Sequence, residues 1–204
     1  MRKFLAFILL GILTLVGAGG AALGAVQSSS ATSITQAVKN TLKAPNYTED
    51  LTEKTPQGNQ QAHLVFQAPD RLAGWLVSSG RKTYLFIIGS TEYIAVTGAA
   101  SASTPKVFYT QQTQGAVAVD PANTYLNYCT KKPATRNGAV TTVTLSQGGE
   151  TETLTCTVSG NYVSNFKAVT PGGTIELAIS SVGSSPAVEL PHGYRTTKTP
   201  PAQG

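Results

Sequence analysis

The residues with the clearest chemistry are two cysteines, Cys129 and Cys156, the only two in the 204-residue chain. In an exported protein, two thiols indicate a disulfide bond; the alternative is a pair of unpaired buried thiols. Each cysteine falls on the apolar side of its predicted element, one in a helix and one in a strand. We therefore expect a Cys129–Cys156 disulfide that joins helix to sheet and stabilises the fold by roughly 3–4 kcal/mol.

The other titratable residues do not form a recognisable catalytic set. Neither His63 nor His192 has Cys, Asp or Glu at a metal-ligand spacing, so no metal site is predicted. Glu150 and Glu152 flank a predicted hairpin turn, where solvated charges are more common than an acid/base pair. The sequence has no Gly-x-Ser-x-Gly nucleophile motif and no phosphate-binding glycine loop. We therefore expect no enzyme activity and no cofactor.

The basic residues gather locally only at Lys131, Lys132 and Arg136. We expect these residues to lie in a solvated loop; the alternative is that they bind an anionic lipid headgroup. The net charge is +5, and without Arg2 and Lys3 the chain has 13 basic and 10 acidic residues, or +3. This charge is too weak and too scattered to indicate nucleic-acid binding.

The first 31 residues have the pattern of a signal peptide. Arg2 and Lys3 precede an apolar run over 4–16, and small residues suited to signal peptidase follow over 17–25. The alternative is an uncleaved anchor over 4–26, which is close to the roughly 20 residues that a membrane span needs. Val26 stands where a lipobox would have its lipid-modified Cys, so no lipid anchor is predicted. With either a signal peptide or an anchor, we expect the rest of the chain to be exported to the cell envelope, the periplasm or the medium.

Two amphipathic segments predict short helices, which are needed to position Cys129 and to cover a sheet. The first begins after Thr32 or Ser33 and ends at Ala44-Pro45, with an apolar stripe at i, i+3, i+4, i+7 and i+8 from Ile34. The second begins at Asp120-Pro121, an N-cap followed by proline at the first helical position. Its stripe consists of Ala122, Tyr125, Leu126 and Cys129.

The remaining sequence predicts antiparallel strands. About five strands occupy 46–97, a short edge strand covers 106–110, and three or four strands fall within 140–180. The later strands alternate apolar with polar residues, so one face is wet. In contrast, Tyr84, Phe86 and Ile88 alternate with Leu85 and Ile87, so both faces of this strand are apolar and both need a cover. The tail over 192–204 is expected to be disordered.

The order of these elements resembles the LolA-like superfamily, which includes the outer-membrane lipoprotein carrier and the LppX/LprG group of mycobacterial lipoproteins. The resemblance covers 32–191, and no single motif in it is specific. It is carried by the first helix, residues 66–71 and 88–93, Asp120-Pro121 with Tyr125-Leu126, and the closing segment 173–191. It implies an α+β fold in which a curved, unclosed antiparallel sheet, a half-barrel of about 9–11 strands, has two short helices on its concave side.

Members of this superfamily carry acylated molecules or lipoproteins between the helices and the concave face, and related domains act as envelope-stress sensors. The resemblance therefore implies an exported lipid-binding protein; the alternative is a sensory or protein-interaction module with a packed interior and an envelope protein partner. Membrane association would arise only through an uncleaved N-terminal segment. The candidate cavity lining is apolar, and a filled core is its simpler reading: Val38, Leu42, Phe66, Trp75, Tyr84, Phe86, Ile88 and Tyr93. The strand pattern alone leaves open which face is concave.

Overall fold

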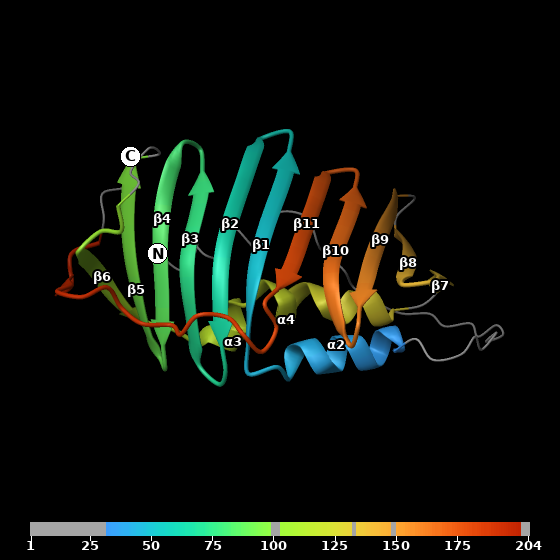
Figure 1. Cartoon of the computed structure of the whole chain (residues 1–204). Coiled ribbons are helices and arrows are strands. Elements are labelled where there is room, and N and C mark those ends of the chain that lie inside the picture. The colour runs from blue at the N-terminus through green and yellow to red at the C-terminus, as the bar shows by residue number, and fades with distance from the viewer. Residues whose placement is uncertain (1–31, 99–102, 132–133, 148–149, 201–204) are drawn as a thin grey trace.

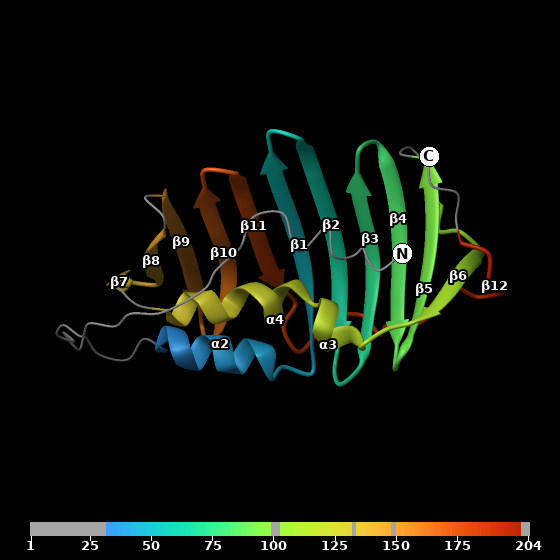
Figure 2. The same cartoon turned by 180° about the vertical axis from the view of Figure 1, so that it is seen from behind.

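A computed structural model describes residues 32–98, 103–131, 134–147 and 150–200, and its main feature is one curved sheet of twelve strands (Figures 1 and 2). The predicted leader, residues 1–31, lies outside the described residues. The strands are β1 (Asn46–Thr55), β2 (Gly58–Gln67), β3 (Arg71–Ser78), β4 (Arg81–Ile88), β5 (Thr91–Gly98), β6 (Val107–Gln112), β7 (Ala134–Asn137), β8 (Val140–Gln147), β9 (Glu150–Ser159), β10 (Tyr162–Thr170), β11 (Gly173–Ser180) and β12 (Arg195–Thr197). The sheet stays open at both ends, so the predicted α+β half-barrel is confirmed.

The strand order is β12-β6-β5-β4-β3-β2-β1-β11-β10-β9-β8-β7, and every pair except β12–β6 is antiparallel. The sequence predicted about 9–11 strands; the short edge strand β7 and the three-residue β12 raise the number to twelve. β12 also differs from the disordered tail expected from residue 192. It forms because the Arg195 N–H donates to the Lys106 carbonyl at 2.7 Å and the chain then runs parallel to β6.

The helices begin where the capping residues predicted. In α2 (Ile34–Leu42), the Ser33 hydroxyl accepts a hydrogen bond from the Gln36 N–H. The second predicted helix is divided into α4 (Pro121–Tyr125), capped by Asp120, and the 3₁₀ helix η1 (Leu126–Thr130), with the short α3 (Ala116–Val119) before it. The predicted inward stripe survives this division, and its four members are buried: Ala122, Tyr125, Leu126 and Cys129.

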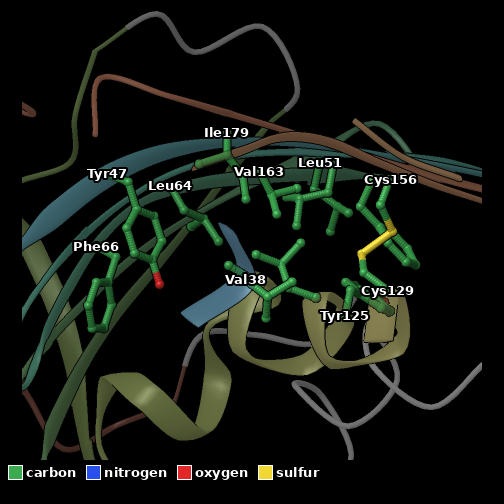
Figure 3. Close-up of a cluster of buried hydrophobic side chains, with 14 of the residues drawn as sticks. Val38, Tyr47, Leu51, Leu64, Phe66, Tyr125, Cys129, Cys156, Val163 and Ile179 are labelled. Carbon is green, nitrogen blue, oxygen red and sulfur yellow. A yellow bond between two sulfur atoms is a disulfide. The ribbon is translucent and has the colours of Figure 1, made fainter. Parts of the chain in front are cut away.

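The helices pack on the concave face, where the sheet arches over them (Figure 3). α2 contacts β9 and β10, η1 contacts β8 to β10, and α4 contacts β1 and β11. We call β1, β2 and β8–β11 the covered half and β3–β6 the open half. In the covered half, Phe166 and Leu177 are fully buried, and the Tyr125 ring stacks on Phe166 at 5.5 Å. This half therefore has a filled core between sheet and helices.

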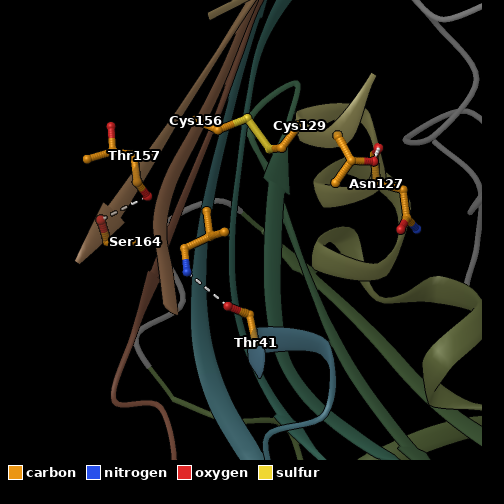
Figure 4. The surroundings of a disulfide bond; sticks show 8 residues. Thr41, Asn127, Cys129, Cys156, Thr157 and Ser164 are labelled. Carbon is orange, nitrogen blue, oxygen red and sulfur yellow. Dashed lines mark hydrogen bonds between the residues drawn. A yellow bond between two sulfur atoms is a disulfide. The ribbon is translucent and has the colours of Figure 1, made fainter. Parts of the chain in front are cut away.

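A disulfide between Cys129 and Cys156 fastens η1 to β9, as the sequence predicted (Figure 4). Both cysteines are fully buried, and their Cα atoms are 5.9 Å apart. On the other side of this core, the buried Thr41 hydroxyl donates to the Ala37 carbonyl and accepts from the Val163 N–H at 2.9 Å. The disulfide and this hydrogen bond fix η1 and α2 to neighbouring strands.

The convex face carries a second, smaller core in the open half. Phe86 and Phe108 meet edge to face at 5.5 Å, with Tyr84 and Ala95 buried beside them. Part of their cover is the segment after β11, which crosses this face (Figure 1) and contributes Leu190. Arg71 holds the segment by donating from Nη1 to the Val188 carbonyl at 3.1 Å. The chain's own C-terminal segment thus supplies one of the two covers that strand β4 needs.

Across the described ranges, the structure has no helix that is both long and apolar enough to span a membrane.

Candidate functional site

The predicted cavity residues are divided between the two faces of the sheet, so they do not line one cavity. Val38, Leu42 and Phe66 lie on the concave side, in or against the main core. On the convex side, Trp75 pairs with Tyr84, and Phe86 pairs with Tyr93. Ile88 lies two residues after Phe86 on β4 and therefore points to the same face. The prediction of a shared lining is wrong for these five residues because neighbouring positions on a strand point to opposite faces.

The concave members of the predicted set belong to packed core rather than to an open site. Phe66 is buried and stacks on Tyr47 with 5.0 Å between ring centroids. Val38 is also buried, and Leu42 is partly buried against the same core. These three residues therefore belong to a filled core, which was the alternative to a cavity lining.

The convex members form a partly covered surface of aromatic and basic residues. The Lys82 Nζ lies 4.6 Å from the centre of the Trp75 ring and 5.0 Å from that of Tyr84. On the other side of Trp75, its cross-strand partner His63 stacks on the Trp75 ring, and the His63 Nδ1 is 2.7 Å from the Asp50 carboxylate. The rings of Trp75 and Tyr84 therefore have cationic or aromatic partners within the chain itself.

The concave face of the open half carries apolar side chains that remain partly exposed, and we call them the open strip: Leu76, Leu85, Ile94 and Val96. Leu76 and Leu85 adjoin the main core and pack against it in part. Leu85 pairs directly with Ile94, and Thr83 connects Leu76 with Val96 in the next row. In Figure 2, α2 and α4 lie across β1 and β9–β11 and α3 lies at the lower ends of β2 and β3, whereas β4 and β5 carry no helix. The sequence contained the signal for this strip, since Leu85 is on the second apolar face of β4.

Gly74 leaves a position without a side chain beside the open strip. It pairs with Leu85 on one side and Leu64 on the other. A Cβ at this position would lie 1.9 Å from the His63 carbonyl oxygen, so no larger residue fits without a backbone shift. The concave surface is therefore kept bare between Leu64 and Leu85.

A hollow of about 350 Å³ lies at the β6 edge of the sheet, among residues of polar type. It is lined by Thr91, Tyr109, Thr110, Gln111, Gln112 and Lys198. This hollow does not correspond to the apolar cavity expected between helices and sheet, because its residues come from the far edge of the open half.

A buried polar cluster on the concave face was missed by the sequence reasoning. The Tyr47 hydroxyl donates to Asp120 Oδ2 at 2.7 Å, and the Ala122 N–H donates to Glu49 Oε1 at 2.7 Å. Glu49 is 0% exposed, and Tyr47 and Asp120 are each 1% exposed. A pattern did exist: Glu49 interrupts the inward positions Tyr47 and Leu51 of β1.

Burial dominates the electrostatics of this cluster. It raises the pKa of Glu49 well above its ordinary value, and the neighbouring charge of Asp120 and a hydrogen bond between the two carboxyls raise it further. Burial also raises the pKa of Asp120, although hydrogen bonds from Tyr47, Glu49 and the Asn123 backbone oppose that rise. The Tyr47 pKa is raised as well, first by burial and then by the two carboxyls.

Two further carboxyls on the concave face are buried. Glu53, 7% exposed, and Glu92, 1% exposed, both have pKa values raised by burial. Glu92 accepts a hydrogen bond from Gln111 Nε2, which partly opposes the rise. Burial and the nearby Glu53 also raise the pKa of Tyr125 to about 12. No group of three or more potential metal ligands occurs among the described residues, so these acids do not form a metal site there.

The remaining sequence candidates are separated from the open strip. Arg136 donates to the Thr32 and Gly138 carbonyls, Lys131 is exposed, and Lys132 lies outside the described residues. Glu150 is exposed at the start of β9, and His192 is exposed near the C-terminal end. The structure does not bring them together with the open strip.

Among the solved structures with similar backbones are two mycobacterial proteins. LprF from Mycobacterium bovis matches with a TM-score of 0.44 and 10% identity, over 79% of this chain and 95% of its own. The lipoprotein LppX of Mycobacterium tuberculosis matches with a TM-score of 0.45 and 13% identity, over 76% and 96%. The backbone is similar to both. At these identities and TM-scores, the similarity carries no information on ligand.

No protein-family model matches the sequence, and no curated protein matches it either.

Proposed function

We propose that this chain is an exported, non-enzymatic protein of the cell envelope that binds an acyl chain or an acylated molecule on the concave face of its open half. The observation that supports the proposal is the open strip: four aliphatic side chains remain partly exposed on the face that the helices cover elsewhere. Export is supported by the leader over 1–31 and by the disulfide, which suits an oxidising compartment.

The chemistry of the open strip suits a flexible apolar ligand. Leu85 and Ile94 form its centre, Leu76 and Val96 extend it along the strands, and the bare position at Gly74 adjoins Leu85. Each methylene that leaves water against such a surface contributes about 0.8 kcal/mol. An acyl chain lying along these strands would therefore be held by burial alone, without a polar anchor.

A matched pair of valines tests this site. Val96 lies on the concave face and Val77 on the convex face, and both are partly buried in strands of the open half. We expect Val96→Glu to weaken binding of a fluorescent fatty acid by about tenfold or more, because a carboxylate must lose water against the acyl chain. Val77→Glu should leave the affinity within about twofold. Equal affinities in the two variants would exclude the open strip as the site.

The protein-interaction module remains the second candidate, and the filled core of the covered half favours it. In that case a protein partner, not a lipid, would cover the open strip. Native mass spectrometry of protein purified from its own host distinguishes the two functions. A co-purifying acylated mass supports the carrier, whereas a bare mass together with no fatty-acid binding supports the module.

A further inference from the structure

The segment over 115–125, which contains α3 and α4, is joined to the sheet by hydrogen bonds that involve buried carboxyls. Its two helices have four and five residues, too short to be stable without packing. The segment lies between two fixed points. Before it, the Thr113 N–H donates to the Ser90 carbonyl at 2.9 Å; after it, Cys129 is bonded to Cys156.

Between these fixed points, the segment is joined to β1 through the carboxyl cluster. Asp120 accepts a hydrogen bond from the Tyr47 hydroxyl, and Glu49 accepts one from the Ala122 N–H. Each carboxyl has one further oxygen, Glu49 Oε2 and Asp120 Oδ1, that is buried and receives no N–H or hydroxyl donor. Two ionised carboxylates in this arrangement would leave both oxygens unsatisfied and both charges uncompensated. A single proton held between them satisfies both.

No cation of the described residues is placed to replace that proton. The lysines of α2, Lys39 and Lys43, are exposed, and so is Lys167 of β10. On β2, His63 lies on the opposite face of the sheet. The other titratable side chains near the cluster are phenols and a carboxyl rather than bases: Tyr47 and Glu53 on β1, Tyr125 on α4 and Tyr128 on η1.

We infer that residues 115–125 form a lid that is held shut by one proton shared between Glu49 and Asp120 and is released when that proton is lost. Lid release would uncover Ala116 and Ala122, which are buried in the same core cluster as Leu72 and Ile87. The concave apolar surface would then extend from the open half toward β1. This lid is a property of the fold and does not depend on any ligand.

The direction of the pH effect follows from the two raised pKa values. In the unfolded chain these carboxyls ionise near pH 4, whereas in the closed state at least one keeps its proton to higher pH. The stability that this proton gives to the closed lid is therefore fully present below about pH 4 and is lost as the pH rises through the raised values. The lid closes in acid and opens toward alkaline pH.

Hydrogen–deuterium exchange of the exported protein at several values from pH 5 to pH 9 tests the lid. Protection factors, which remove the intrinsic pH dependence of exchange, should fall by about tenfold or more for amides over 115–125 as the pH rises, while those of β10 stay within about threefold. In Glu49→Gln, which keeps an acceptor for the Ala122 N–H and cannot ionise, the fall should disappear. The matched control Glu92→Gln removes an equally buried carboxyl on β5 and should retain the fall.

Asp120→Asn provides a second variant if Glu49→Gln fails to fold, because Asn caps helices as well as Asp does. A segment whose protection does not change with pH in the wild type would overturn the lid. So would a fall that persists in Glu49→Gln or Asp120→Asn. Because exchange is measured without lipid, a failure here is independent of whether the open strip binds acyl chains.

Discussion

The two halves of the sheet use the same strand alternation for different purposes. In the covered half, α2, α4 and η1 close the concave face, and the outward positions are polar, such as Lys167 and Glu176. In the open half, both faces are apolar: the C-terminal segment covers part of the convex face, and the concave face keeps the open strip. The covered half thus has its core on the concave face, whereas the open half has a small core on the convex face and leaves apolar side chains partly exposed on the concave one.

The largest difference between the halves should appear in leucine truncations. Leu177 is fully buried on β11, whereas Leu85 on β4 is partly exposed on the same concave face. Leu177→Ala should lower the free energy of unfolding by about 3–5 kcal/mol through lost burial and the cavity left behind. Leu85→Ala should lower it by only about 1 kcal/mol, because Leu85 packs against the core in part and already contacts water. Urea denaturation measures both, and equal losses would mean that the open half is packed as a core.

The disulfide should matter almost as much, and in the covered half only. It closes a loop with a sequence separation of 27 residues, so its removal in the Cys129→Ala/Cys156→Ala variant should lower stability by about 3–4 kcal/mol. Amide exchange at temperatures below the transition should increase in η1 and remain unchanged in β4 and β5. Faster exchange in β4 and β5 would show instead that the halves unfold as one unit.

The smallest effect is expected on the convex cover of the open half. Arg71→Ala removes the hydrogen bond to the Val188 carbonyl and should lower stability by about 1 kcal/mol. The fluorescence of Trp75, the only tryptophan of the chain, should report any loosening of this face. Arg136→Ala is the control, because that exposed arginine donates to the Thr32 and Gly138 carbonyls, away from the open half. A change in Trp75 fluorescence in both variants would argue against a local cover.

Much of the fold was predictable because its signals are local. Ser33 and Asp120 fix the helix starts through their capping hydroxyl and carboxylate, and both caps are present in the structure. The inward stripe that ends at Cys129 and the alternation around Cys156 together located the disulfide. Each of these signals depends on residues within one or two turns of a helix or along one strand.

The site was less predictable because it depends on contacts between residues far apart in the chain. Alternation placed Leu85 and Ile87 opposite Tyr84 and Phe86, but it did not say which set faces the helices. The predicted lining took Tyr84 and Phe86, which are convex, and joined them to Phe66, which is concave. Likewise, Glu49 and Ala122 are separated by 73 residues, and no local pattern indicates that they hydrogen-bond.

The sequence by itself determined the long strands, the helix starts, their order, the disulfide and the two apolar faces of β4, but not the short α3, β7 and β12. Only the tertiary structure decided which face is concave, how far the helices extend across it and which acids become buried. The physical reason is that side-chain periodicity is set by the backbone of a single element, whereas curvature and cover result from how the helices, the C-terminal segment and the strands pack together.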